Sequence, residues 1–561
     1  MSTNKHINVF VAVMMAAVTL FSTVLLYFSA NEEVVAAFSP SSECRYEELF
    51  DQYHVMEIEI SMEEEDFTDI LENPTAEEYK KCDITVDGET YANAAIRTKG
   101  NTSLSQVASS DSDRYSFKVE FDHYVFGQSL EGLDKLVLNN IFCDATYVKE
   151  YMAYDIFNYL GVACPYYCFA HITINGQEWG LYLALEAMED AFVERVYGTR
   201  DGELYKPESA NAGGGGMGGE RSQMDGEMPQ MDGEMPQMDG EIPQMNGERP
   251  QMGGEAPHIN GEAPQMDGEK PQMSDRMPQT EGEAPRNDMH QKDGFGQSGG
   301  GSDLVYTDDD IDSYQDIFDQ ASFSPTDEDK ERVIEALKNL SEGKGLEKYI
   351  DVDACLRYFA AQTFIVNMDS YYSNLKHNYY LYEENGQLTI LPWDLNLAFG
   401  GFQAAGATDA VNNAIDTPMG GNLEEERPLF SKLMEVEEYK NIYHKYLNEI
   451  VDGYIGSGQF TKTLHTVTAL IDAYVKEDAT AFYGYEEYLE GVENLERFVL
   501  LRAESVEAQL DGQLPSTTEG QKNCTNLIDA SEVELDAMGV QGGDGKGGKG
   551  GPGKFFPKTS E

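Results

Sequence analysis

Alternating apolar and polar residues predict strands in the first part of the chain. Residues 55–62 read V-M-E-I-E-I-S-M, in which an apolar side chain recurs at every second position, as in a strand that buries one face. Asp-Gly and Asn-Gly pairs between apolar runs predict hairpins, because both residues of such a turn tolerate positive φ. These pairs are Asp87-Gly88, Asn175-Gly176 and Asn385-Gly386. The pattern predicts a β-rich N-terminal part over residues 55–208.

Apolar residues at helical spacing predict helices in the second half. After a capping box at Thr326 and Asp329, one helix face is apolar at Val333, Ile334, Leu337 and Leu340. A helix near residues 352–366 leads the chain directly to Asp369, and further helices follow residue 423. The predicted fold class is therefore α+β, with a mainly helical C-terminal part over residues 303–512.

A low-complexity insertion, residues 209–302, separates these two parts. Between residues 224 and 286 it repeats M-D-G-E-M-P-Q and variants, and the Pro and Gly of nearly every copy exclude a coiled coil. Such a segment cannot bury enough apolar surface to offset its ordering entropy, so we expect it to be disordered. An expanded repeat without a function of its own is the simpler interpretation, and binding of a partner or of cations is the alternative. The tail, residues 513–561, ends in a Gly/Lys-rich run and is also predicted to be disordered.

The N-terminus holds an uncharged, mostly apolar run, residues 7–30, between Lys5 and the acidic pair Glu32 and Glu33. It is long enough to cross the ~30 Å hydrocarbon core of a membrane, and its flanking charges place the N-terminus inside. We expect residues 1–30 to be an uncleaved signal anchor, followed by a juxtamembrane linker over residues 31–54. A cleaved signal peptide is the alternative. In both cases the protein is exported, membrane-anchored or secreted, and lies outside the cytoplasm.

Composition narrows the classes of partner. The formal net charge is −62, from 101 acidic and 39 basic residues, which argues against nucleic-acid binding. The seven cysteines lack the paired C-x-x-C spacing of a zinc site, and they are too few for a disulfide scaffold.

Oxygen-bearing side chains gather in residues 367–400. Asp369 and Asn374 share one short loop, and the hairpin around Asn385-Gly386 brings Asp394 back toward them. Three such side chains suit a hard cation, Mg²⁺ or Mn²⁺, and a phosphorylated ligand. The alternative is a buried aromatic hairpin with solvated acids.

This order of residues resembles the catalytic and magnesium loops of protein kinases, D-x-x-x-x-N followed by a hairpin and a metal-binding Asp. His-Arg is missing before the Asp, and P-W-D-L-N-L-A-F-G stands in place of D-F-G. Together with H-N-Y-Y-L-Y, N-G-Q-E-W-G-L-Y-L-A-L-E and R-T-K-G-N-T-S, this variant resembles the spore-coat CotH kinase family. The resemblance covers roughly residues 50 to 510 and implies an atypical protein kinase-like fold of two lobes.

The resemblance also implies a reaction, in which phosphate passes from ATP to a Ser or Thr hydroxyl of another protein. Asp369 would orient that hydroxyl and take up its proton, and Asn374 and Asp394 would hold Mg²⁺ or Mn²⁺ against the phosphates. Lys118 or Lys99 would contact the α- and β-phosphates, and the sequence does not separate the two. The alternative for both lysines is a solvated strand residue.

Three further residues are assigned by the same resemblance. Glu150 would pair with the strand lysine, and Glu186 and Lys206 would line the nucleotide cleft. The alternatives are an exposed Glu150 favoured by its helix dipole and a surface position for Glu186.

The implied substrates are secreted, coat or surface proteins. Two rivals remain at this stage. One is an inactive structural or adhesive surface protein on the same fold, and the other is an enzyme that transfers a different group, such as AMP.

Overall fold

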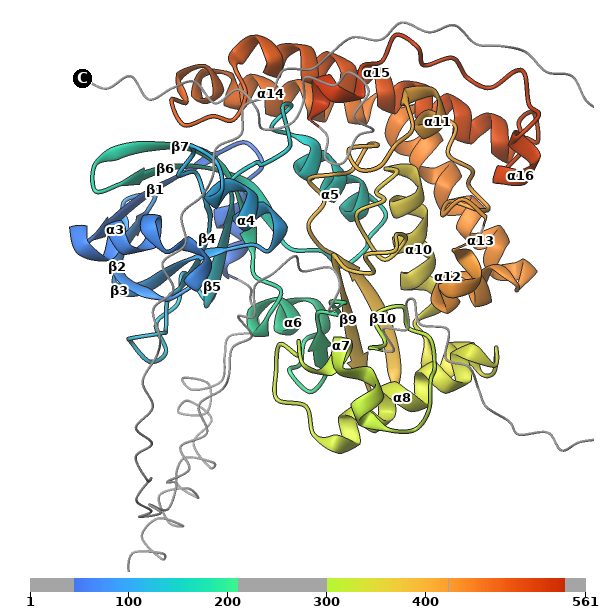
Figure 1. Cartoon of the computed structure of the whole chain (residues 1–561), viewed down its shortest axis with the longest axis horizontal. Helices are drawn as coiled ribbons and strands as arrows, with labels where there is room; N and C mark the ends of the chain where they lie inside the picture. Colours follow the sequence, from blue (N-terminus) through green and yellow to red (C-terminus); the bar gives the residue numbers. More distant parts are fainter. Residues whose placement is uncertain (1–44, 210–299, 422, 540–561) are drawn as a thin grey trace, which may run out of the picture. The chain divides into compact units, whose positions relative to one another are not determined.

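The computed structural model describes residues 45–209, 300–421 and 423–539. The expected signal anchor and the repeat, residues 1–30 and 224–286, lie outside these residues. Within the described ranges, no helix is both long and apolar enough to cross a membrane. The described residues confirm the α+β class, with strands dominating the N-terminal part and helices the C-terminal part (Figure 1).

Seven strands of the N-terminal part close into a barrel in the order β1-β2-β3-β4-β5-β7-β6. Neighbours pair antiparallel except β1 and β6, which run parallel. The strands, blue to teal in Figure 1, are β1 (Val55–Met62), β2 (Lys80–Val86), β3 (Glu89–Lys99), β4 (Ser116–Glu120), β5 (Lys135–Asn139), β6 (Tyr167–Ile174) and β7 (Gln177–Glu186).

Local sequence explains the hairpins and the faces of these strands. Asp87 and Gly88 take φ values of 47° and 87°, and Asn175 and Gly176 take 50° and 75°, which confirms both predicted turns. In β1 the apolar side chains are buried in the barrel core and the alternating acids are exposed, as the period of two predicts.

Short helices accompany the barrel: α3 (Glu64–Glu72), α4 (Thr102–Ala108), α5 (Lys149–Tyr159) and α6 (Asp190–Tyr197). The side chain of Asp144 accepts the backbone N–H groups of Thr146 and Lys149, each at 2.9 Å, and so orders the turn that leads into α5. Helix α5 packs against β6 on one side and against α10 of the C-terminal part on another. It therefore connects the cores of the two parts.

A second sheet, ordered β10-β9-β8, begins the C-terminal part and joins β8 (Glu203–Tyr205) to the hairpin of β9 (Tyr379–Glu384) and β10 (Gln387–Pro392). The hairpin turn has φ values of 53° at Asn385 and 84° at Gly386, as predicted. In α8 the capping box at Thr326 and Asp329 is also confirmed.

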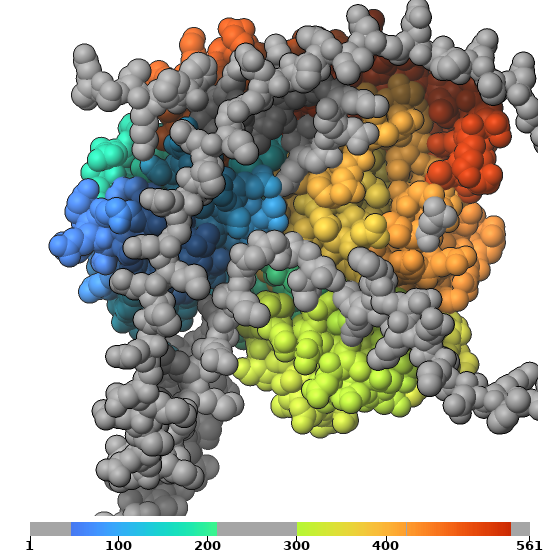
Figure 2. Space-filling view, viewed as in Figure 1, coloured from blue at the N-terminus to red at the C-terminus, as the bar shows by residue number. Residues whose placement is uncertain are grey.

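The remaining helices form the C-terminal core, which includes α10 on β10. They are α7 (Gln315–Phe318), α8 (Asp327–Ser341), α9 (Leu346–Tyr349), α10 (Val352–Phe364), α11 (Ala407–Val411), α12 (Pro428–Met434), α13 (Glu437–Asn448), the π-helix η5 (Glu449–Ile455), α14 (Gln459–Glu477), α15 (Tyr485–Leu510) and α16 (Thr518–Gln521). Figure 2 shows the residues around α8 as a continuous yellow-green surface.

The chain on either side of the insertion meets at one residue. Asp316 accepts a hydrogen bond from the backbone N–H of Glu208 at its carbonyl, and its own N–H donates to the carbonyl of Gly300, both at 2.9 Å. The chain thus leaves the described part at residue 209 and returns to it at residue 300, with both ends bound to the backbone of Asp316.

The predicted disorder from residue 513 is wrong for residues 513–539. The Ile528 N–H donates to Asn412 Oδ1 at 3.0 Å, and the Glu534 N–H donates to Asn494 Oδ1 at 2.8 Å. Met538 is buried, and its carbonyl accepts the N–H of Ala145. The Gly/Lys-rich run that suggested disorder begins only at Gly542, among residues outside the described ranges.

Candidate functional site

Asp369 lies on the loop that follows α10, and both of its carboxylate oxygens are held. His377 Nε2 lies 2.7 Å from Oδ1, and Asn378 Nδ2 donates to Oδ2 at 3.0 Å. Asn367, two residues earlier, accepts the Asp369 N–H on its side-chain oxygen, also at 3.0 Å. The N-x-D spacing thus turns the chain, and the residues after the loop orient the carboxylate.

Asn374 does not take part in these contacts. It is exposed on the same loop, whereas the side chains that bind Asp369 come from His377 and Asn378. The sequence placed Asn374 by its distance of five residues from Asp369. The loop instead turns so that the residues at distances of eight and nine face the carboxylate.

Asp394 enters the same site from the end of the hairpin, two residues after β10, in the left-handed region at φ 56°. Burial raises the pKa of Asp394, the charge of Lys99 lowers it, and the negative charge of Asp369 raises it further. Lys206 and His377 also lower this pKa. The structure therefore brings Asp369 and Asp394 together, as the hairpin predicted.

Lys99, and not Lys118, faces this group. The Lys99 ammonium donates to Asn139 Oδ1 at 2.9 Å and lies 5.6 Å from the centre of the Trp393 ring, next to Asp394 in sequence. Burial lowers the pKa of Lys99, and the charge of Asp394 opposes that effect. Lys118 instead pairs with Glu189 at 2.5 Å. Of the two candidates, these contacts place only Lys99 beside the Asp394 loop.

Glu150, the second residue of α5, completes the connection. Asn139 Nδ2 donates to both carboxylate oxygens of Glu150, at 3.1 and 3.0 Å, so one amide bridges Lys99 and Glu150. The residue is 5% exposed, which excludes the solvated alternative. Burial, followed by the charge of Asp394, raises the pKa of Glu150 to about 8.

Glu186 and Lys206 have different surroundings. Glu186 is fully buried, and its oxygens accept the Tyr46 hydroxyl at 2.6 Å, the Tyr166 N–H at 3.0 Å and the Arg195 Nε at 3.0 Å. Its carboxylate oxygens are therefore occupied by segments next to the barrel, and Glu186 is not among the charges that act on Asp394. The charge of Lys206, by contrast, acts on Asp394.

A comparison with protein-family models decides which family these features belong to. The model described as CotH kinase protein matches residues 96–252 and 279–506, more than half of the 561 residues. The chain belongs to the CotH kinase protein family. The match contains Lys99, Asp369 and Asp394, and its gap lies in the repeat. A search of curated proteins found no match.

The residues of this CotH kinase protein that sequence reasoning missed are mostly amides and aromatics. Asn139 ends an ordinary strand pattern, L-D-K-L-V-L-N, and nothing in that pattern marks its side chain as a bridge. His377 and Asn378 open the H-N-Y-Y-L-Y motif, which identified the family without indicating their contact with Asp369. Trp393 lies in the P-W-D-L-N-L-A-F-G motif, and the sequence assigned this residue no role of its own.

The donor set of the CotH site fits a magnesium nucleotide. Mg²⁺ prefers oxygen ligands and is commonly held by one or two carboxylates together with substrate phosphates. Asp394 offers such a carboxylate, and the positive charges of Lys99 and Lys206 act on it, although Lys206 also pairs with Glu208 at 2.5 Å. Among the described residues, no group of three or more His, Cys, Asp and Glu side chains is placed to hold a metal alone.

Proposed function

We propose that the protein is a protein kinase that transfers the γ-phosphate of ATP to Ser or Thr hydroxyls of secreted, coat or surface proteins. In this proposal the barrel and the helical part act as the two lobes of a kinase-like fold. The observation that carries it is the proximity of three residues from separate segments, since the charges of Lys99 and Asp369 both act on Asp394.

Each residue has a role that its surroundings support. Asp394 holds Mg²⁺ or Mn²⁺, which neutralises phosphate charge when bound. Lys99 binds the α- and β-phosphates, and Lys206 adds positive charge near Asp394. Asp369, fixed by His377 and Asn378, orients the acceptor hydroxyl and accepts its proton. Positioning and charge neutralisation supply most of the rate enhancement in phosphoryl transfer.

The location and the partners belong to the same proposal. The apolar run at residues 7–30 supports export and attachment to a membrane. A net charge of −62 supports basic protein substrates, since opposite charge accelerates encounter and like charge opposes it.

Transfer of radioactive label tests the proposal. The purified protein is incubated with ATP labelled at the γ-phosphate and with Mg²⁺ or Mn²⁺, beside Asp369→Ala and Asp394→Ala. Casein, a basic protein and the protein itself serve as acceptors. We expect label to be incorporated by the wild type and by neither variant. Full activity of Asp394→Ala would refute the assigned site.

Two controls separate the rivals. ATP labelled at the α-phosphate reports transfer of AMP, which would replace the kinase assignment by that of an AMP-transferring enzyme. Calorimetry with ATP and Mg²⁺ reports nucleotide binding without chemistry. Absence of both label and binding would favour an inactive structural or adhesive protein.

A further inference from the structure

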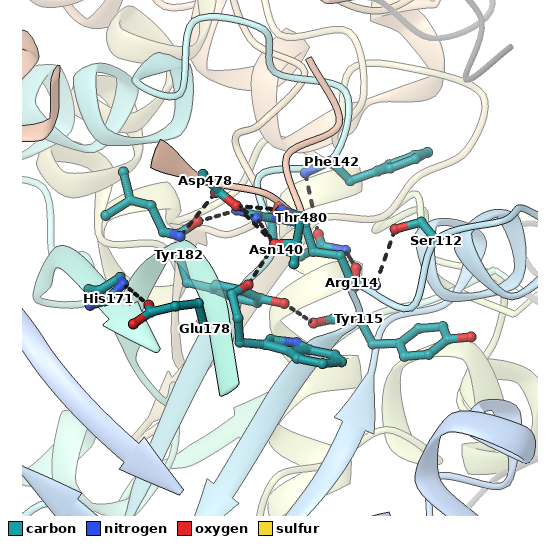
Figure 3. A network of polar contacts seen from close by, with 12 residues as sticks. Ser112, Arg114, Tyr115, Asn140, Phe142, His171, Glu178, Tyr182, Asp478 and Thr480 are labelled. Carbon is teal, nitrogen blue, oxygen red and sulfur yellow. Dashed lines mark hydrogen bonds and ion pairs between the residues drawn. The ribbon is translucent and has the colours of Figure 1, made fainter. Parts of the chain in front are cut away.

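A buried ion pair joins the helical C-terminal part to the barrel near the candidate site. Arg114 lies just before β4, and Asp478 caps the C-terminus of α14. Their side chains are 1% and 0% exposed, and Arg114 Nη1 lies 2.7 Å from Asp478 Oδ2. Figure 3 shows the guanidinium and the carboxylate turned toward each other.

The pair is embedded in further hydrogen bonds. Arg114 Nε donates to the carbonyl of Asn140 at 3.0 Å, Nη1 donates to Thr480 Oγ1 at 2.7 Å, and Nη2 donates to the carbonyl of Leu181. Asp478 accepts the N–H groups of Leu181 at 3.1 Å and Thr480 at 3.0 Å. Because both charges are removed from water and fully hydrogen bonded, loss of either would leave the other uncompensated.

Gly180 leaves the space in which the ion pair of Arg114 and Asp478 lies. It takes φ 103°, and a Cβ atom at this position would lie 2.4 Å from Asp478 Oδ1 and 2.6 Å from Arg114 Nη1. This glycine is the second of the N-G-Q-E-W-G motif. The space that it leaves is filled by the ion pair of two other segments.

The pair fixes a short segment, residues 139–142. Asn140 receives Arg114 Nε at its carbonyl, and its side chain donates to the Arg114 carbonyl at 2.6 Å. The Asn140 side chain also accepts the N–H of Phe142 at 3.3 Å. Three hydrogen bonds of Asn140 thus hold this segment to Arg114 and to itself.

Both ends of residues 139–142 contact the candidate site. At one end, Asn139 bridges Lys99 and Glu150. At the other end, the carbonyl of Phe142 accepts Asn396 Nδ2 at 3.0 Å, and Asn396 lies two residues after Asp394. The segment therefore spans from the lysine of the barrel to the loop of Asp394.

We propose that Arg114 and Asp478 are positioning residues for the nucleotide site, which act by holding residues 139–142 between Lys99 and the Asp394 loop. The role assigned to that site rests on the proposed function. The physical linkage does not, because it is defined by contacts in the protein alone. Neither residue is assigned contact with the nucleotide.

Asp478→Asn tests this role, since it removes the charge and keeps the shape. The matched control is Glu383→Gln in β9, because Glu383 is likewise 0% exposed and pairs with Arg332 at 2.8 and 2.9 Å, away from residues 139–142. Calorimetry measures the Kd of ATP with Mg²⁺, and thermal unfolding measures Tm. A displacement of about 1 Å in a site can lower the rate of the reaction about a hundredfold.

We expect Asp478→Asn to raise the Kd about tenfold or more, and Glu383→Gln to change it less than about twofold, while both lower Tm. An increase in Kd no larger than that of the control would overturn the proposal. If Asp478→Asn does not fold, Thr480→Val replaces it, because this variant removes a hydroxyl that contacts both Arg114 and Asp478 and keeps their charges. We expect it to raise the Kd about threefold.

Amide hydrogen exchange of the nucleotide-free protein distinguishes failure of the proposal from failure of the proposed function. Faster exchange over residues 139–156 in Asp478→Asn, but not in Glu383→Gln, supports the linkage even if the wild type binds no ATP. Unchanged exchange over these residues overturns it. Absence of ATP binding by the wild type would count against the kinase function alone.

Discussion

Two lysines on neighbouring strands show what decides function at the scale of the residue. In the register of β3 and β4, Arg97 lies opposite Lys118, and Lys99 lies two residues further along the same face. The sequence pattern does not distinguish the two lysines, because it shows only that each is a polar residue on a predicted strand. Their partners differ: Lys99 contacts Asn139, and Lys118 contacts Glu189.

Lys99→Met is expected to reduce kcat/KM for ATP at least about a hundredfold, which corresponds to about 2.7 kcal/mol of transition-state stabilisation. The reason is loss of an ammonium whose charge acts on Asp394. Lys118→Met is the matched control, with an expected change below about threefold. Steady-state kinetics at varied ATP measures both, and an equal loss in the two variants would contradict the assignment of Lys99.

Glu150 makes stability depend on pH. Its pKa rises from 4.5 to about 8 on folding, because of burial and the neighbouring charge of Asp394. Between these two values the folded protein binds more protons than the unfolded chain, so the free energy of unfolding falls as pH increases from about 4.5 to about 8 and loses this dependence above it. Glu150→Gln is expected to flatten the slope. Urea unfolding at several pH values measures it, and an unchanged slope in the variant would exclude Glu150 as its source.

At the scale of the element, the loop after α10 is held from outside. Arg427 is fully buried and donates through Nε to the carbonyl of Tyr371 at 2.7 Å and through Nη2 to the carbonyl of Ser373. These two residues lie between Asp369 and His377. A positively charged side chain thus uses its hydrogen bonds to fix the backbone of the loop that carries Asp369.

Arg427→Lys is expected to lower kcat while leaving KM for ATP nearly unchanged, because Lys99 and Asp394 lie on other segments. Arg427 uses two different nitrogens for the two carbonyls, and lysine has only one. At least one carbonyl therefore loses its hydrogen bond, which costs about 1–3 kcal/mol of stability. Kinetics and urea unfolding measure the two effects. Arg332→Lys serves as the control on α8, and an equal loss of kcat in that variant would argue for a general loss of fold.

Local elements were the ones that the sequence predicted well. The turn at Asn385-Gly386 and the capping box of α8 depend on a few adjacent residues, and both are confirmed. The parallel pairing of β1 with β6 that closes the barrel joins segments more than 100 residues apart, and no local pattern records it. The contact of Asn139 with Lys99 and Glu150 was missed for the same reason, whereas Asp369 and Asp394 were found because one hairpin connects them.

At the scale of the whole molecule, the C-terminal segment 526–539 connects distant elements. It binds Asn412 after α11 and Asn494 in α15, and Gly539 accepts the buried ammonium of Lys149 at 2.6 Å. Lys149 is the residue before Glu150. A segment that composition predicted to be disordered therefore contacts the start of the helix that carries Glu150.

A chain that ends at residue 525 is expected to be less stable than one that ends at residue 539 by about 3–6 kcal/mol, the value of burying Val533 and Met538. Loss of the acceptor for Lys149 adds to this difference. Urea unfolding of the two truncated proteins measures it, with the full chain as reference. Equal midpoints would show that residues 526–539 contribute nothing to folding.

The meeting of both ends of the insertion at Asp316 has a consequence for how this gene can change. Because Glu208 and Gly300 bind the same residue, Asp316, copies of the repeat can be gained or lost between them without displacing either end. Even for a flexible chain, doubling the length of a loop costs only about 0.6 kcal/mol of closure entropy. Replication slippage within the repeat would therefore yield proteins of many lengths that share one folded body, and selection could act on that length separately from the site.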